Sequence, residues 1–395
     1  MKKGAYLKTC GMILVFSLGI ASITSARTIT VDDDLPADFN NIQAAINDAN
    51  DGDTVLVADG TYTGTGNRDI DFLGKAITLR SENGPQNCII NCQGSGRGFY
   101  FHSGEDANSV LDGFTIINGY KANGGGIRCT GSSPHITNCV ITDNVAPWVP
   151  GFPGSFATSG GGILTEVCSP IIDNCIISNN IATDRGGGIK CYTGGDPRYS
   201  PTLRNCIITG NTAHIGGALY RCRGPITNCT ICYNSASLRG GGVYDCGGLI
   251  TNCIIWSNGD DLYLSSATYS CIEDFDSGTG NIHSDPCFAD LNNDDYHLKS
   301  QAGRWEPNNQ TWVKDEVTSP CIDGGDPGSP IGDEPFPNGG IINMGAYGGT
   351  TEASKSYFGR PPCEIIIAGD VNGDCIVNYL DFRLMALNWL RDERL

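Results

Sequence analysis

The chain has 395 residues, of which 54 are glycine, 39% are hydrophobic and only 17% are charged. This composition predicts many short strands joined by tight turns and argues against a protein built from long helices. The formal net charge of −18 argues against nucleic acids and anionic membranes as partners, and against polyanions unless a cation bridges them.

The first 26 residues have the pattern of a signal peptide. Lys2, Lys3 and Lys8 precede an apolar run over 10–23, and small residues follow at 24–26. The run is too short for a comfortable membrane span. We therefore expect export to the extracellular space or the cell surface, with no membrane span left after cleavage. Cleavage removes one of 19 cysteines, and the even number that remains permits disulfides.

A short amphipathic helix followed by a strand is predicted within residues 40–63. Asn40 or Asn41 is a suitable N-cap. The apolar positions of this helix are Ile42, Ala45, Ile46 and Ala49. The strand TVLVA comes next, and a helix at this place is suited to cover an open sheet edge.

Two short motifs alternate through residues 124–258. The first is N-C-x-I-x-x-N, and its five copies begin at Asn138, Asn174, Asn205, Asn228 and Asn252 and close at Asn144, Asn180, Asn211, Asn234 and Asn258. The second is glycine-rich, typically GGGI, and begins at Gly124, Gly160, Gly186, Gly216 and Gly240. The leading asparagines are 36, 31, 23 and 24 residues apart, so the basic unit is the shortest spacing and two units carry insertions.

A repeat of this length with three short strand signals predicts an all-β solenoid, namely a single-stranded parallel β-helix. Its crossovers are expected to be right-handed. The motif cysteines should form one interior stack, the isoleucines two residues later another, and the asparagines side-chain ladders at turns. Cys206 is therefore predicted to be a buried core residue and not a metal ligand or nucleophile.

The same segments carry a family resemblance. Residues 40–63, GKAITLRSENGP from Gly74 and the alternating rung motifs resemble secreted right-handed β-helix proteins of the pectate-lyase-like superfamily. SPCIDGGDP from Ser319 and NMGAYGG from Asn343 resemble the closing segment of such proteins. The resemblance implies one β-helix domain over 27–357 with an N-terminal helical cap. Cys287 and Cys321 are expected to pair in the closing segment.

Residues 358–395 are predicted to form a small calcium-binding module with an EF-hand-like loop and helix. The loop DVNGDCIVNYLD places oxygen donors at the spacing that Ca²⁺ requires. The expected ligands are Asp370, Asn372, Asp374, Ile376 through its carbonyl, Asn378 and Asp381. The segment resembles one half of a type I dockerin repeat, which implies a cohesin-like or cell-surface partner. It departs from that pattern at Cys375, where the loop normally has glycine, and at Asp381, where it has Glu.

The insertions at 145–159 and 192–200 flank the predicted GGGI sheet on opposite sides. In the superfamily that the chain resembles, the substrate groove runs along this sheet, so the two loops are expected to wall a cleft. Residues suited to contact sugar rings are Trp148, Phe152, Phe156, Arg128, Tyr192, Tyr199, Tyr220 and Tyr244. The alternative, that the aromatic residues only fold the loops onto themselves, stays open.

Two chemistries are compatible with the polar residues near this sheet. A polysaccharide lyase needs a base, for which Lys190, Arg185 or Arg198 is a candidate. A glycosidase needs two carboxylates, for which Glu166 with Asp184 or Asp196 is a candidate. The candidate catalytic residues are therefore Glu166, Asp184, Lys190 and Arg198.

The expected function is that of an exported β-helix protein that binds or cleaves an extracellular polysaccharide, as an O-glycosyl hydrolase or as a lyase. The alternative is a non-catalytic structural, adhesive or carbohydrate-binding surface protein. Ca²⁺ is the only cofactor that the sequence indicates, and the identity of the sugar is not encoded in any motif.

Overall fold

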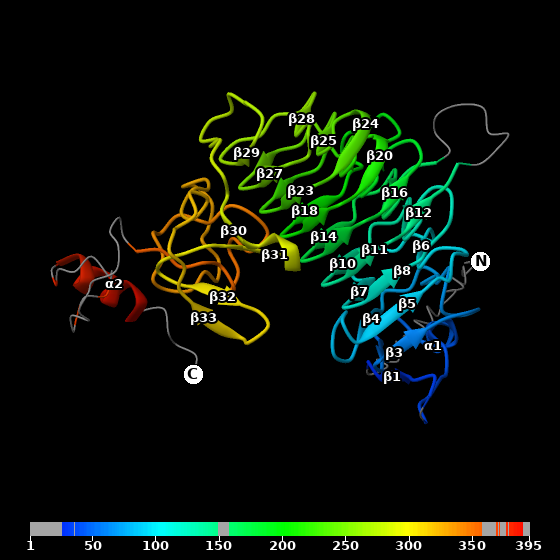
Figure 1. Cartoon of the computed structure of the whole chain (residues 1–395). Coiled ribbons are helices and arrows are strands. Elements are labelled where there is room, and N and C mark those ends of the chain that lie inside the picture. Colours follow the sequence, from blue (N-terminus) through cyan, green and yellow to red (C-terminus); the bar gives the residue numbers. More distant parts are fainter. Residues whose placement is uncertain are drawn as a thin grey trace, which may run out of the picture.

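A computed structural model describes residues 26–34, 36–148, 158–357, 369, 371, 377 and 379–389. The predicted signal peptide lies outside these residues, except for Ala26. Phe152, Phe156 and the expected calcium ligands other than Asp381 also lie outside them. The described chain winds into a parallel β-helix, as predicted, and a C-terminal segment lies along one side of the coil (Figure 1).

Four parallel sheets run along the coil. Sheet A contains β1 (Thr28–Val31), β2 (Thr54–Val57), β4 (Thr78–Ser81), β7 (Val110–Asp112), β10 (His135–Thr137), β14 (Ile171–Asp173), β18 (Thr202–Arg204), β22 (Ile226–Thr227) and β26 (Ile250–Thr251). Sheet B contains β3 (Gly60–Tyr62), β5 (Cys88–Asn91), β8 (Thr115–Ile117), β11 (Val140–Thr142), β15 (Ile176–Ser178), β19 (Ile207–Thr209), β23 (Thr230–Cys232), β27 (Ile254–Trp256) and β29 (Cys271–Ile272).

Sheet C is formed by the strands that follow the glycine-rich motif. It contains β6 (Phe99–Phe101), β9 (Ile127–Thr130), β13 (Ile163–Glu166), β17 (Ile189–Tyr192), β21 (Leu219–Tyr220), β25 (Val243–Tyr244) and β28 (Leu262–Tyr263). Sheet D contains the short strands β12 (Val145–Ala146), β16 (Ile181–Ala182), β20 (Thr212–Ile215) and β24 (Ser235–Arg239). The sequence predicts three strands per turn. Sheet D adds a fourth strand, which begins directly after Asn144, Asn180, Asn211 and Asn234.

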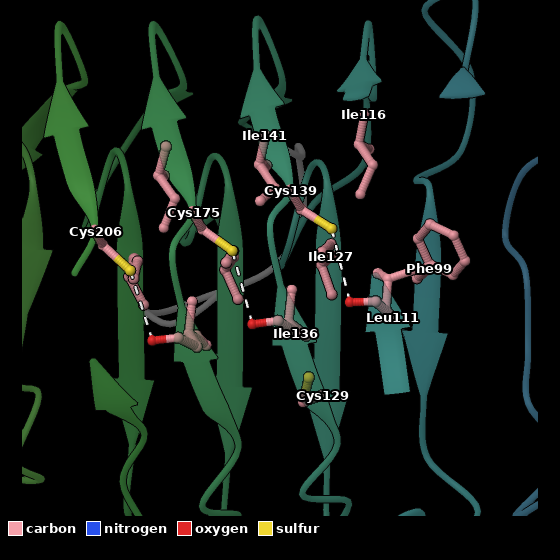
Figure 2. Close-up of a cluster of buried hydrophobic side chains, with 14 of the residues drawn as sticks. Phe99, Leu111, Ile116, Ile127, Cys129, Ile136, Cys139, Ile141, Cys175 and Cys206 are labelled. Carbon is pink, nitrogen blue, oxygen red and sulfur yellow. Dashed lines mark hydrogen bonds between the residues drawn. The ribbon is translucent and has the colours of Figure 1, made fainter. Parts of the chain in front are cut away.

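The interior of the coil is built from the predicted side-chain stacks. Ile141, Ile177, Ile208, Ile231 and Ile255 pair in register along sheet B and are fully buried. Figure 2 shows Cys139, Cys175 and Cys206 at equivalent places on successive rungs, all pointing inward. The Cys206 thiol donates to the carbonyl of Arg204 at 3.2 Å, and Cys206 is 0% exposed. Its predicted role as a core residue is confirmed.

The asparagine prediction is correct for only half of the residues. The closing asparagines are buried and form a continuous amide ladder, in which Asn144, Asn180 and Asn211 each donate to the next carbonyl oxygen at 2.9–3.0 Å. The leading asparagines adopt the left-handed conformation instead, with φ of 49° at Asn174. Among the described residues they form no continuous ladder: Asn252 donates to Asn228 at 3.5 Å, whereas Asn138 donates to Asp112 and Asn205 to the C-terminal segment.

Glycine is required in the turn before sheet C. Gly160 has a φ of +67°, and a Cβ built on Gly161 would lie 2.5 Å from the Gly187 carbonyl oxygen of the next rung. The first position therefore needs left-handed geometry and the second needs close backbone approach. This explains why the motif recurs before five successive strands of sheet C.

The N-terminal cap also agrees with the sequence. Helix α1 (Ile42–Asp48) begins after Asn41, whose side chain accepts from the Ala44 backbone N–H at 2.9 Å. Ile42, Ala45 and Ile46 are buried against the first turns. Asn41, rather than Asn40, is thus the N-cap. At the other end of the chain α2 (Tyr379–Trp389) is the helix expected after the calcium loop.

The C-terminal segment contains two antiparallel hairpins and a 3₁₀ helix. Its elements are β30 (Phe288–Asp290), η1 (Leu291–Asn293), β31 (Asp295–Leu298), β32 (Arg304–Glu306) and β33 (Thr311–Val313). The expected Cys287–Cys321 disulfide is wrong, since both cysteines are free. Cys321 is buried and contacts Cys271 of the last rung instead. Among the described residues, a disulfide joins Cys191 and Cys222 on neighbouring rungs.

Candidate functional site

The outer face of sheet C carries a ladder of large side chains, one from each rung. In register, the ladder runs Tyr100, Arg128, Leu164, Lys190, Tyr220, Tyr244 and Tyr263. Four arginines lie beside it, namely Arg97, Arg185, Arg221 and Arg239. We call these eleven residues the cation–tyrosine strip. Of the residues selected from the sequence, Arg128, Lys190, Tyr220 and Tyr244 belong to the ladder, which ends in a tyrosine on each side.

Lys190 is the most unusual residue of the strip. It stands on the outer face of β17 but is only 5% exposed, and its Nζ donates to the Ser159 hydroxyl at 3.0 Å. Burial, together with the positive charge of Arg185, lowers the pKa of Lys190 to about 8. A lysine of this kind has a substantial neutral fraction near neutral pH, which an exposed lysine lacks.

The rungs on both sides of Lys190 are also covered. Leu164 is 1% exposed and Tyr220 is 3% exposed, although neither belongs to the interior core. The guanidinium carbons of Arg185 and Arg221 lie 5.4 and 5.3 Å from the centre of the Tyr220 ring. These cation–π contacts hold two arginines against the strip next to Lys190.

A second group of cations lies at the N-terminal end of the strip. Arg97 and Arg128 lie 5.1 and 5.2 Å from the centre of the Tyr100 ring. Arg97 is 4% exposed, and burial followed by the charge of Arg128 lowers the pKa of Arg97 to about 10. The Arg97 guanidinium also lies 3.7 Å from Asp69.

At the other end the strip becomes aromatic. The rings of Tyr220 and Tyr244 are stacked with centres 5.2 Å apart, and those of Tyr244 and Tyr263 are 5.1 Å apart. Arg239 covers the Tyr263 ring at 5.1 Å. The strip therefore carries three consecutive stacked tyrosines at this end, with Arg221 and Arg239 beside them. The faces of these rings are occupied by one another, and their hydroxyl edges suit hydrogen bonds to sugar hydroxyls.

The two candidate carboxylates are engaged by cations. Glu166 accepts from Arg128 at 2.6 Å and from the Thr130 hydroxyl at 3.0 Å. Asp184 forms an ion pair with Arg185 at 3.4 Å. Each carboxylate is held by a partner of its own, so the geometry does not present a free acid and base across one bond, as a glycosidase requires.

Of the four candidate catalytic residues, Glu166, Asp184 and Lys190 are close enough for their charges to interact. The charges of Asp184 and Glu166 both act on the Lys190 ammonium. Arg198 is separate: it pairs with Asp196 at 2.7 Å in the loop after β17, and its side chain is 86% exposed. The structure thus favours Lys190 over Arg198 as the candidate base.

The loop aromatics lie on both flanks of sheet C, as the sequence predicts. Trp148 follows β12 on the flank where the sheet C strands begin, and Tyr192 ends β17 on the opposite flank, in register with Glu166. Trp148, Tyr192 and Tyr199 are all exposed. Phe152 and Phe156 lie outside the described residues.

The calcium loop is described only in part. Asp381, in the first turn of α2, is 0% exposed, and its Oδ1 accepts from the Val371 backbone N–H at 2.7 Å. This contact joins the beginning of the predicted loop to its last ligand position. Within the described residues no group of three or more His, Cys, Asp or Glu side chains is arranged to hold a metal ion.

Several strip residues were missed in the sequence. Tyr100 and Tyr263 lie outside the clear repeats, and only the alternation FYF around Tyr100 signals an outward aromatic residue. Arg97 and Arg221 were missed because each lies in or next to a turn, where strand periodicity does not apply. The net charge of −18 also pointed away from cations, yet six of them gather on this one face.

Comparisons with known proteins place the chain among its relatives. The sequence profile of the family described as "Disaggregatase related" matches residues 119–325, which include the strip from Arg128 to Tyr263. The crystal structure of pectate lyase Pel9A is similar with a TM-score of 0.45 and 15% sequence identity, covering 82% of this chain and 97% of that chain. No curated protein sequence matches the chain.

Proposed function

This chain belongs to the disaggregatase-related family, and on that premise we propose that it is an exported β-helix protein that binds and cleaves an acidic polysaccharide along the outer face of sheet C. The observation that carries the proposal is Lys190, a covered lysine with a pKa of about 8 among arginines. Enzymes that abstract protons from carbon use a base whose pKa lies near the working pH.

The arginines define the class of substrate. Arg128, Arg185 and Arg221 lie on the same face as Lys190, and guanidinium groups bind carboxylates through paired hydrogen bonds. A uronate-containing chain laid along the coil axis would place its carboxylates over these arginines and its hydroxyls against the edges of Tyr244 and Tyr263. This proposal departs from the expectation, drawn from the net charge, that polyanions need a bridging cation.

The chemistry assigned to the site is β-elimination. Neutral Lys190 takes the proton from the ring carbon next to the uronate carboxylate, and that electron pair forms a double bond to the neighbouring carbon. The glycosidic bond from the neighbouring carbon to oxygen then breaks, and the leaving oxygen takes a proton from water. Arginines at the carboxylate stabilise the negative charge that develops during proton removal.

The test is turnover of uronate polysaccharides by the purified chain, read as ultraviolet absorbance of unsaturated uronates and, in parallel, as new reducing ends. We expect both signals, with a rate that rises with pH through about 8 as Lys190 loses its proton. Lys190→Ala should lower the rate by about 10³-fold or more, and Lys121→Ala, at an exposed lysine, should leave it unchanged.

Reducing ends without unsaturated products would indicate hydrolysis and contradict the role of Lys190. Binding without either product would favour the alternative of a non-catalytic carbohydrate-binding or adhesive surface protein. The strip is compatible with that alternative, since cations and stacked tyrosines bind saccharides without turnover.

We also propose that residues 358–395 bind Ca²⁺ and anchor the protein to a cohesin-like or other cell-surface partner. The burial of Asp381 and its contact with Val371 support a closed loop. The donors would be Asp370, Asn372, Asp374, Asn378, Asp381 and the Ile376 carbonyl. Bound Ca²⁺ would supply charge that orders the loop.

Calorimetric titration of the full chain with Ca²⁺ tests this module. One site is expected, and its affinity should fall by at least about ten-fold in Asp370→Ala, because a charged ligand is removed. Heats that are absent or identical in the variant would contradict the module.

Export is tested by the N-terminal sequence of the secreted protein, which should begin near Arg27. Within the described part of the chain, no helix is both long and apolar enough to cross a membrane.

A further inference from the structure

A second concave surface lies between the coil and the C-terminal segment, away from sheet C. It consists of two cavities of about 450 and about 660 Å³, which share Asn174, Asn205, Thr350 and Thr351. We call this surface the amide groove. Its volume is in the range of sites that bind small molecules or short oligomers.

The groove exists because the C-terminal segment covers only some of the rungs. The Asn205 amide donates to the carbonyls of Ala346 and Gly348 at 2.9 and 2.8 Å, and Asn228 donates to Asn343 at 3.1 Å. These contacts fix the segment on the later rungs. On the earlier rung the equivalent Asn174 remains exposed and lines both cavities.

Tyr347 and Glu352, which line the smaller cavity with Asn174, both contact the buried side chain of His297. His297 is 1% exposed, and its two ring nitrogens lie 2.6 Å from Asp295 and 3.3 Å from Glu352. Its ring stacks on Tyr347 with centres 3.6 Å apart. Burial opposes protonation of His297, but its hydrogen bonds to the Asp295 and Glu352 carboxylates raise its pKa. Tyr347 and Glu352, which line the groove, are thus held in place by a buried partner.

The lining identifies the chemistry of the ligand. The Asn174 amide and the Thr351 hydroxyl can both donate and accept hydrogen bonds, as sugar hydroxyls do. The Thr350 hydroxyl already donates to the Tyr347 carbonyl at 2.7 Å, so toward a ligand it is an acceptor. Asp173 and Arg204, at the edge of the larger cavity, neutralise each other at 2.6 Å. Glu352 and Asp333 leave the lining slightly negative, so the groove differs from the cation–tyrosine strip and does not suit an anion.

We propose that the amide groove is a second saccharide-binding site, which takes an uncharged, hydroxyl-rich stretch of polysaccharide through Asn174, Thr350, Thr351, Tyr347 and Glu352. The choice of a saccharide rests on the proposed function, whereas the groove itself does not. The site would hold one chain of a polysaccharide matrix while the strip acts on another segment.

The test measures binding of neutral hexasaccharides of glucose, xylose, mannose and N-acetylglucosamine to the full chain by calorimetry and saturation-transfer NMR. Asn174→Gly removes the amide and keeps the left-handed backbone. Asn179→Gly is the matched control, because Asn179 is also exposed and left-handed, with φ of 54°, but lies at another turn of the same rung.

At least one of these probes is expected to bind, with an affinity that falls about ten-fold in Asn174→Gly and stays within two-fold in Asn179→Gly. Asn174→Trp, which fills the groove, should abolish binding. No binding of any probe at millimolar concentration, or equal loss in both glycine variants, would overturn the proposal. Lys190→Ala separates the two proposals, since it should abolish turnover and leave this binding intact.

Discussion

At the scale of one residue, the buried charge of Lys190 lowers the stability of the folded protein. Its pKa falls from 10.5 to about 8 because the folded protein disfavours its charge. The unfolded chain therefore binds the proton more tightly, and folding pays a cost on the order of 3 kcal/mol. This cost is full below about pH 8 and disappears by about pH 10.5.

Lys190→Met should therefore raise the free energy of unfolding at pH 7 by about 1–3 kcal/mol, because it removes the buried charge and keeps the volume. The gain should vanish near pH 10.5. Urea denaturation of both proteins at the two pH values measures it. A destabilised variant at pH 7 would show that the lysine stabilises the fold and would weaken its assignment as a base.

At the scale of the element, the closing asparagines determine how one rung is joined to the next. Asn180 is 0% exposed; its amide donates to the Ile141 carbonyl at 2.8 Å, and its carbonyl oxygen accepts from the Asn144 backbone N–H at 3.0 Å. Both backbone groups would lose these partners without the side chain. Unsatisfied buried polar groups cost about 1–3 kcal/mol each.

Asn180→Ala is thus expected to destabilise the protein by about 3 kcal/mol. Asn179→Gly, at the preceding exposed position, should change stability by less than about 0.5 kcal/mol. Thermal or urea unfolding followed by circular dichroism distinguishes the two. Similar losses in both variants would mean that the amide ladder does not contribute specifically.

In the C-terminal segment, the buried side chain of Glu334 also binds backbone groups, as Asn180 does in the coil. Its Oε1 accepts from the backbone N–H groups of Asn343 and Gly349 at 2.7 and 2.9 Å. Its Oε2 is buried without a hydrogen-bond partner among the described residues. Burial raises the pKa of Glu334 from 4.5 to about 7. Because the pKa of Glu334 is higher in the folded than in the unfolded chain, its ionisation lowers the free energy of unfolding. This loss is absent below about pH 4.5 and complete above about pH 7.

Glu334→Gln keeps the acceptor and removes the charge. We expect it to raise the free energy of unfolding at pH 8 by about 2 kcal/mol and to leave it nearly unchanged at pH 4.5. Denaturation at both pH values measures the difference. A gain of equal size at both values would contradict the assigned pKa.

At the scale of the whole molecule, charge is distributed unevenly. The chain carries a net charge of −18, yet six cations lie in the cation–tyrosine strip, and the amide groove is slightly acidic. The two surfaces should therefore respond differently to salt, because screening weakens charge attraction and leaves hydrogen bonding between neutral groups largely unchanged.

Raising NaCl from about 0.05 to about 0.5 M should weaken binding of polygalacturonate by about ten-fold or more, whereas a neutral hexasaccharide should change by less than two-fold. Calorimetry on the same preparation of Lys190→Ala, which prevents turnover, provides both values. An affinity for polygalacturonate that does not change with salt would argue against the strip as its binding surface.

Repetition made the coil predictable, because a stacked rung must present the same side chains at the same depth on every turn. Cys206 and Ile208 were recognised as core for this reason, and Asn41 was recognised as one of two possible N-caps. Features without repetition were not predictable. The Cys287–Cys321 pairing failed because Cys321 approaches Cys271 only after the C-terminal segment folds back.

The sequence by itself determined the rung length, the interior stacks, the cap and the flanks on which the two insertions emerge, since all of these follow from local periodicity. Only the tertiary structure decided that Lys190 is covered, that Arg198 turns away to Asp196, and that the C-terminal segment forms a groove with Asn174. These properties depend on which groups from distant parts of the chain come into contact. Such contacts do not follow the repeat, so the sequence pattern does not reveal them.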